Sequence, residues 1–247
     1  MSKVEMRIGE LRRMSKTDYY QQLGVAMTCR SFKEYEEMFS LDGPLLKSGK
    51  ILDVASGASS FVAELSKRGY DAVAVDPLYR LTLDEITTLG KSEIEIATKK
   101  IANAEHLFVW ESYANLESHN QIRLHSFQQF LESYQNEHRE EKYIPAALPT
   151  LPFEDETFSL IICNHFLFLY QEQFDYDFHL NAINELLRIT KKDGVIRIYP
   201  LVGFKNEMYP YIDKLTETLS HSGNEIELTS TKFRFLPSAT RFLNIKK

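Results

Sequence analysis

The sequence predicts an α/β fold: one domain around a doubly wound, mostly parallel sheet of seven strands, with an antiparallel edge strand and a helical insertion. Two observations lead to this class. Short apolar, β-compatible segments alternate with longer segments of helical periodicity, as they do where helices connect parallel strands. The last two predicted strands follow each other without a long crossover, which predicts an antiparallel pair at an edge. At 247 residues, 43% of them hydrophobic, the chain can bury one complete core.

The predicted elements follow in order from the N-terminus. We expect partly helical structure across the N-terminal segment 1–47. Within it, Ser31 and Glu34 have the spacing of a capping box that opens a helix over 31–39. Turn residues at 42–44 are expected to end that helix. Strands are expected at about 50–55, 71–75, 143–147, 158–163, 195–199, 225–229 and 241–245, and further helices at 59–68, 175–190 and within 206–221.

Residues 80–140 interrupt this alternation. They are rich in polar residues with helically spaced apolar ones, and they exceed by far the dozen or so residues that a crossover needs. We therefore predict one crossover helix plus a helical insertion within the single domain 1–247. Insertions at the carboxyl ends of parallel strands lie over the ligand crevice, so this segment is a candidate lid over the substrate. A helical decoration remote from the site is the alternative.

Composition and charge narrow the function classes. The formal charge of −6 provides no global basic field, so neither nucleic acid nor an anionic membrane is an expected partner. Cys29 and Cys163 match neither a metal spacing nor a disulfide framework and are expected to be small buried residues. No metal, hydrolase or P-loop motif occurs. An apolar signal core and a membrane-spanning run are also missing from the sequence, which predicts a cytoplasmic protein.

A strand, a turn of small residues, a helix and a second strand ending in an acid follow one another between residues 50 and 77. The strand Ile51 to Val54 is apolar. Positions 56–60 carry only small side chains, so backbone N–H groups there can approach a ligand closely. Asp76 lies nineteen positions after Gly57, near the roughly 20-residue spacing at which an acid meets ribose hydroxyls. This pattern is typical of a protein that holds an adenosine-containing cofactor.

The details of the turn choose among such cofactors. A dinucleotide fold would use G-x-G-x-x-G, and only Gly57 is present here. Asp53 would repel a pyrophosphate, whereas a zwitterionic amino acid with a sulfonium tolerates a nearby carboxylate. The segment resembles the first motif of the class I S-adenosylmethionine-dependent methyltransferases. The resemblance implies S-adenosylmethionine as cofactor, with Asp53 as the motif's acid, Gly57 as its central glycine and Asp76 as the ribose-binding acid.

Two later segments extend the resemblance. Residues 151–163 are similar to the L-P-F-x-D-x-x-F-D-L-V segment of these enzymes, and residues 185–195 are similar to their E-x-x-R-V-L-K-P-G-G passage. The resemblance implies that the loop after the third strand, with Leu148, flanks the adenine. It also implies that the end of the fourth strand, with Asn164, faces the methyl group. More narrowly, residues 58–64 and 165–170 look like a bacterial, small-molecule-type subgroup whose substrate is unassigned.

The chain departs from the family pattern at three positions. Ala55 and Ser59 replace the outer glycines. Alanine disfavours a positive φ, so the turn at Ala55 must use a negative φ or accept strain. Ser59 offers a hydroxyl either to the methionine carboxylate or to the start of the helix. Ala147 stands where many relatives have an acid for the adenine amino group. The predicted cofactor-binding residues are Asp53, Ala55, Ser56, Gly57, Ser59, Asp76, Pro77, Leu148 and Asn164.

His165 is the candidate catalytic residue. Methyl transfer from a sulfonium requires positioning, exclusion of water and, for some acceptors, removal of a proton. His165 directly follows the fourth strand, and a neutral imidazole is available near pH 7. A structural role in the loop is the alternative. Arg197, in an otherwise apolar strand, is expected to form a structural ion pair. Five rings are candidates for an aromatic acceptor pocket: Tyr79, Trp110, Phe166, Phe168 and Tyr170.

The leading function is therefore S-adenosylmethionine-dependent methyl transfer to a small-molecule acceptor. Three alternatives stay open. A methyltransferase-like binding or regulatory module without turnover is motivated by the changes at Ala55, Ser59 and Ala147. An RNA methyltransferase belongs to the same broad class, and a nucleotide-cofactor oxidoreductase is disfavoured by the missing glycines. The sequence determines neither the acceptor nor the oligomeric state.

Overall fold

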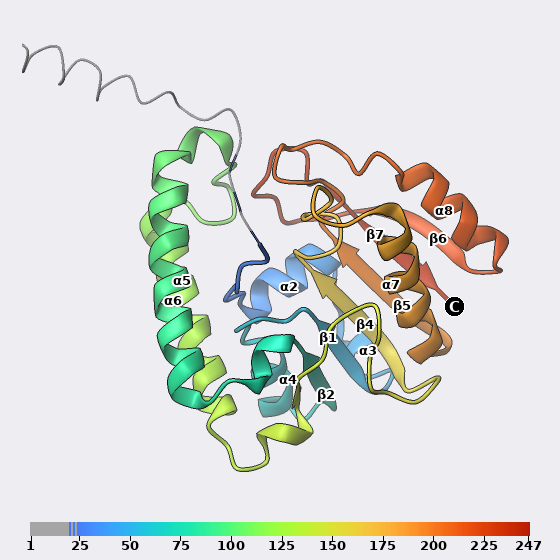
Figure 1. Ribbon diagram of the computed structural model, residues 1–247, viewed down its shortest axis with the longest axis horizontal. Coiled ribbons are helices and arrows are strands. Elements are labelled where there is room, and N and C mark those ends of the chain that lie inside the picture. The colour runs from blue at the N-terminus through green and yellow to red at the C-terminus, as the bar shows by residue number, and fades with distance from the viewer. Residues whose placement is uncertain (1–19, 21, 23) are drawn as a thin grey trace, which may run out of the picture.

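A seven-stranded sheet lies at the centre of the molecule in the order β3-β2-β1-β4-β5-β7-β6 (Figure 1). The computed structural model describes residues 20, 22 and 24–247, so the predictions for residues 1–19 lie outside the described residues. The fold class is confirmed: β7 pairs antiparallel with β5 and β6, and the other neighbours pair in parallel. The strands are β1 (Ile51–Val54), β2 (Ala72–Val75), β3 (Tyr143–Ile144), β4 (Phe158–Asn164), β5 (Thr190–Tyr199), β6 (Glu225–Ser230) and β7 (Arg241–Lys246).

The order of the strands reverses at β1, and this places the functional edge of the sheet. Strand β2 lies on one side of β1 and β4 on the other, with Val54 in register with Val75 and with Cys163. The carboxyl ends of these three strands therefore meet at one edge. In open α/β sheets this switch point is where ligands bind.

Helices cover both faces of the sheet. Because successive side chains of a strand point to opposite faces, Ile51 joins the core beneath α2 and α4, and Leu52 joins the core beneath α7 and α8. Figure 1 shows α7 and α8 on one side of the sheet and α2 with α4 on the other. Their bounds are α2 (Phe32–Phe39), α3 (Gly43–Leu46), α4 (Phe61–Lys67), α7 (Tyr176–Ile189) and α8 (Ile212–His221).

The N-terminal helical prediction is confirmed in part. Ser31 and Glu34 form the predicted capping box at the start of α2. Residues 24–30 precede it without helical structure. The turn residues at 42–44 do not end α2, which already closes at Ser40. They begin α3 instead, because the Asp42 side chain accepts the N–H of Leu45.

Two strands differ from their predicted ranges. Strand β3 has two residues rather than five, because Pro145 has no N–H to continue the ladder. Strand β5 begins at Thr190 rather than at Val195, and it contains a bulge before Val195. The register with β4 changes there, since Phe158 pairs with Thr190 and Leu160 pairs with Val195.

The insertion forms two long helices that pack side by side. These are α5 (Leu83–Asn103) and α6 (Leu116–Tyr134). Short 3₁₀ turns at Pro77–Arg80 and Arg139–Glu141 precede and follow the pair, and a third at Glu105–Leu107 lies between the two helices. A Cβ on Gly90 of α5 would lie 2.2 Å from the Phe127 ring of α6, so glycine permits their close contact. Figure 1 shows the pair along one side of the domain, with the dark-blue stretch of residues 24–30 between it and the sheet.

Candidate functional site

The carboxyl ends of β1 and β2 bring two buried acids to the predicted cofactor site. Asp53 accepts hydrogen bonds from the Ser56 hydroxyl at 2.6 Å and from the Tyr35 hydroxyl at 3.0 Å. Asp76 directly follows β2 and accepts the N–H of Gly57 at 3.0 Å. The structure therefore brings Asp53, Ser56, Gly57 and Asp76 together, because one βαβ unit places both strand ends at the same edge.

Burial raises the pKa of both carboxyl groups. It raises the pKa of Asp53 to about 7, opposed in part by hydrogen bonds from two hydroxyl groups. Burial also raises the pKa of Asp76, against the effect of two backbone N–H donors. A cation bound beside these groups would favour their ionised forms. The site thus suits a ligand with positive charge and hydroxyl groups.

The turn after β1 is left-handed at two positions. Ala55 has φ +54° and Gly57 has φ +56°. Of the two conformations considered for Ala55, the structure therefore shows the strained one. Glycine at position 57 is required for a second reason. A Cβ there would lie 2.9 Å from the carbonyl oxygen of Thr28, which crosses over the turn.

Backbone carbonyls before α2 accept hydrogen bonds from the N–H groups that were expected to face a ligand. The carbonyl of Thr28 accepts the N–H of Ala58 at 3.0 Å. The carbonyl of Arg30 accepts the N–H of Ser60, also at 3.0 Å. The N–H groups of Ala58 and Ser60 are therefore already paired with backbone carbonyls of residues 28 and 30.

The other predicted cofactor residues lie in different surroundings. The Ser59 hydroxyl accepts the N–H of Phe61 at 3.1 Å and donates to the carbonyl of Arg30 at 3.0 Å, whereas the N-cap of α4 is Ser60. Pro77 is exposed, and Leu148 is buried in the core on the α7 side of the sheet. Ala147 is exposed and lies beyond the short β3, so it does not stand at a strand end. Their predicted roles toward a cofactor stay predictions.

Asn164 and His165 end β4 beside the acids. The Asn164 amide oxygen lies 2.5 Å from Nδ1 of His165. The same buried amide group lies beside the hydroxyl of Tyr35 and acts, through a hydrogen bond, to lower the pKa of Tyr35 against the stronger effect of burial. Burial, and then the positive charge of Arg30, hold the pKa of His165 well below its usual value. The imidazole is therefore neutral at pH 7.

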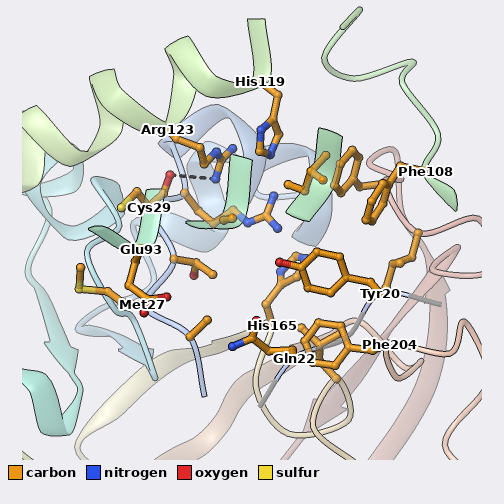
Figure 2. A pocket seen from close by; sticks show the side chains of 18 of the residues that line it. Tyr20, Gln22, Met27, Cys29, Glu93, Phe108, His119, Arg123, His165 and Phe204 are labelled. Carbon is orange, nitrogen blue, oxygen red and sulfur yellow. Dashed lines mark hydrogen bonds between the residues drawn. The ribbon is translucent and has the colours of Figure 1, made fainter. Parts of the chain in front are cut away.

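A cavity of about 120 Å³ is lined on one side by residues 26–30, the same stretch whose carbonyls bind the turn after β1 (Figure 2). Its walls come from the N-terminal segment, from α5 and α6, and from the loops that follow β4, β5 and β6. His165 lines it together with the rings of Tyr20, Phe108 and Phe204. Both helices of the predicted lid therefore border the cavity.

The aromatic pocket exists, but mostly with other rings than those predicted. Of the five candidates only Tyr170 lines the cavity. Tyr79 packs against Tyr143 in the core, Phe168 stacks on His179 of α7, and Trp110 packs against Phe235. Phe166 likewise turns toward α7, with ring contacts to residues 174 and 178.

A buried ionic cluster forms one wall of the cavity and was missed from the sequence. Glu34 binds Arg30 at 2.9 Å, and it also binds Arg123 of α6 and the hydroxyl of Tyr113. One pattern in the sequence indicates such a cluster. His119, Arg123 and residue 126 recur at i, i+4 and i+7, which places three polar side chains on one face of a helix. All three are buried.

Other singled-out side chains have structural roles. Arg197 donates to the carbonyl of Phe39 at 2.5 Å and to the Asn244 side chain at 3.0 Å. The predicted ion pair is therefore wrong: neutral oxygens at the end of α2 and on β7 accept its hydrogen bonds. Cys29 and Cys163 are buried free thiols, as predicted, and burial raises the pKa of each to about 12.

Neither a metal site nor a membrane-spanning helix is found in the part of the chain that the structure describes. There, no group of three or more His, Cys, Asp or Glu residues is placed to hold a metal ion. None of the helices found there combines the length and the apolar character needed to cross a bilayer. The cytoplasmic location stays a prediction.

Known proteins resemble this chain in sequence and in fold. A family model described as a methyltransferase domain matches residues 108–198. An uncharacterized protein of Methanocaldococcus jannaschii is 32% identical over 219 residues, covering 88% of this chain and 94% of that protein. A TehB-like SAM-dependent methyltransferase from Corynebacterium glutamicum has 15% identity and a TM-score of 0.46, covering 99% of this chain and 95% of that one. The 1,6-didemethyltoxoflavin-N1-methyltransferase of Burkholderia thailandensis has 11% identity and a TM-score of 0.44, covering 87% and 77%.

The sheet order, the acids at the ends of β1 and β2 and the domain match define the class of this protein. The chain belongs to the class I S-adenosylmethionine-dependent methyltransferases, in the same family as the archaeal protein. The predicted family and the predicted cofactor, S-adenosylmethionine, are confirmed. The narrower resemblance to a bacterial subgroup stays a prediction.

We expect Gly57→Ala to lower the free energy of unfolding by about 1–3 kcal/mol. A left-handed backbone costs a residue with a Cβ roughly 1–2 kcal/mol, and this Cβ would also meet the carbonyl of Thr28. Ala55→Gly is the matched control, because it places glycine at a φ of +54° and should change stability by less than about 1 kcal/mol. Urea unfolding measures both. Equal losses in the two variants would contradict the assignment.

We expect Asp53→Asn to alter the pH dependence of stability. Folded Asp53 keeps its proton up to a pKa of about 7, whereas the unfolded chain releases it near 3.8. This contribution to stability is complete below 3.8 and is lost as the pH rises to about 7. The free energy of unfolding of wild type minus variant should therefore fall across that window. Asp71→Asn, at the exposed start of β2, is the control, and a constant difference for Asp53→Asn would refute the raised pKa.

Proposed function

We propose that this protein transfers a methyl group from S-adenosylmethionine to a small-molecule acceptor that binds in the cavity beside His165. The observation that carries the proposal is the position of the cavity, which shares His165 and the N-terminal segment with the cofactor edge. A cavity of about 120 Å³ with largely aromatic walls suits a small molecule. A strand of RNA would need an open, basic surface, which the charge of −6 does not favour.

The residues at the strand ends fit the cofactor. Asp76 directly follows β2, where its carboxylate can accept hydrogen bonds from ribose hydroxyls, and the Asn164 amide lies at the end of β4. The Asp53 carboxyl lies on β1, where a bound cation would favour its ionised form. When bound, S-adenosylmethionine supplies a methyl group on a cationic sulfur. These residues bind and orient that group, and α5 and α6 exclude water from the acceptor.

His165 is the proposed general base for an acceptor that carries a proton on its nucleophile. Its Nδ1 faces the amide oxygen of Asn164 and therefore carries the hydrogen. Nε2 is then the atom that accepts a proton from the acceptor. The low pKa keeps this nitrogen unprotonated, although it also makes His165 a weaker base than an ordinary histidine.

Calorimetric titration with S-adenosylhomocysteine tests the cofactor assignment. We expect micromolar binding, no binding of NAD, and a loss of at least about tenfold in affinity for Asp76→Asn, because the ribose hydroxyls lose a charged partner. Asp71→Asn, which directly precedes β2 and so lies at the opposite end of that strand from Asp76, should bind like the wild type. Unchanged affinity in a folded Asp76→Asn variant would remove the ribose role.

The protonation state of His165 is measurable without an acceptor. In nitrogen–proton NMR spectra, we expect its imidazole to stay neutral at about pH 6 with the proton on Nδ1, because burial and Arg30 disfavour the charged form. The spectrum of His165→Gln identifies the signal. A charged ring at that pH, or a proton on Nε2, would exclude the role of general base.

A further inference from the structure

Arg30 has hydrogen-bond donors that no described residue uses. Its Nη1 donates to Glu34 at 2.9 Å and to the Tyr113 hydroxyl at 2.6 Å. Its Nε is buried without a partner, and its Nη2 makes no hydrogen bond to the residues that the structure describes. The residue lines the cavity and is 8% exposed. Buried polar groups are paired with few exceptions, so free guanidinium donors at a cavity wall indicate a ligand with acceptor atoms.

The net charge of the ionic cluster around Glu34 also favours an anionic ligand. Arg30 and Arg123 share the single carboxylate of Glu34, so two positive charges and one negative leave one positive charge in excess. Both Nη groups of Arg123 are used, since Nη1 donates to the carbonyl of Cys29 at 2.8 Å and Nη2 binds Glu34, although its Nε is also buried without a partner. Glu93 of α5 lines the same cavity and forms an ion pair with neither arginine. Of the two guanidinium groups, that of Arg30 therefore keeps the unused terminal donor.

Flat rings line one side of the cavity (Figure 2). Tyr20 stacks on Phe204 with centroids 5.5 Å apart, and Tyr170 meets the same ring edge-on at 5.2 Å. Phe108 stacks on Phe235 at 4.3 Å. The volume of about 120 Å³ is close to the roughly 150 Å³ of an apolar protein cavity that admits benzene. The space between these walls fits a single aromatic ring.

We propose that the methyl acceptor is a single-ring aromatic acid and that Arg30 binds its carboxylate. The proposal rests on the proposed function and names the substrate class of that site. A carboxylate matches the planar fork of a guanidinium and neutralises the excess charge of the cluster. The ring lies among the aromatic side chains, and His165 on the same cavity faces its reactive substituent. Arg30 is thus a specificity-determining residue.

The methionine part of the cofactor also carries a carboxylate. The experiment therefore has to distinguish binding of the acceptor carboxylate by Arg30 from binding of the cofactor carboxylate. The full chain is titrated calorimetrically with 4-hydroxybenzoate and with its neutral analogue 4-hydroxybenzamide. Each titration is done with and without S-adenosylhomocysteine. We expect the wild type to bind the acid at least about tenfold more tightly than the amide.

Variants of Arg30 assign the preference to this side chain. Arg30→Met should bind acid and amide equally while its affinity for S-adenosylhomocysteine stays within about twofold of the wild type. Arg30→Lys retains the charge and should keep part of the preference. Arg234→Met is the matched control, because Arg234 pairs with Glu111 and does not line the cavity.

Two outcomes overturn the proposal. Equal binding of acid and amide by the wild type does so whether or not any variant folds. Loss of S-adenosylhomocysteine binding in folded Arg30→Met does so as well, since Arg30 then serves the cofactor carboxylate. If the wild type fails to bind S-adenosylhomocysteine, the proposed function fails instead. The titrations done without S-adenosylhomocysteine still measure whether the protein prefers the acid to the amide.

Discussion

The carboxylate of Glu34 is the interaction on which the arrangement of the site depends. It accepts the N–H and hydroxyl of Ser31 at the start of α2, and it binds Arg30 of the N-terminal segment and Arg123 of α6. Burial acts to raise the pKa of Glu34, but Arg123 and Arg30 outweigh it and hold the pKa well below its usual range. Removing one partner from such a buried pair costs about 3–5 kcal/mol, because a charge is left uncompensated. Glu34 therefore keeps helix, segment and insertion in one geometry.

Arg30 links the two halves of the site through different atoms. Its carbonyl accepts the N–H of Ser60 beside the cofactor turn and the hydroxyl of Ser126 on α6. Its guanidinium lines the cavity, and its charge adds to burial in holding the pKa of His165 below its usual value. A movement of the N-terminal segment that opens the cofactor turn would also shift this guanidinium. Cofactor entry and acceptor binding thus involve the same stretch of backbone.

The cofactor edge and the acceptor cavity arise in different ways. The edge comes from one continuous βαβ unit, whose buried acids are satisfied by nearby hydroxyl and N–H groups. The cavity is assembled from the N-terminal segment, the insertion and three loops of the sheet. A common sheet with variable additions is the usual basis for one fold serving many substrates. Here the additions carry both the excess charge and most of the rings.

The sequence by itself determined the features that local chemistry controls. The small-residue turn at Gly57, the acid at Asp76 and the capping box at Ser31 were predicted because each depends on a short spacing along the chain. The fold class and the insertion followed from periodicity in the same way. Tertiary structure decided the bulge before Val195, the carbonyl partners of Arg197 and the rings of the cavity. The physical reason is distance: Tyr20, Arg123, Phe204 and Phe235 meet only when separate segments pack together, and no periodicity within one segment reports that contact.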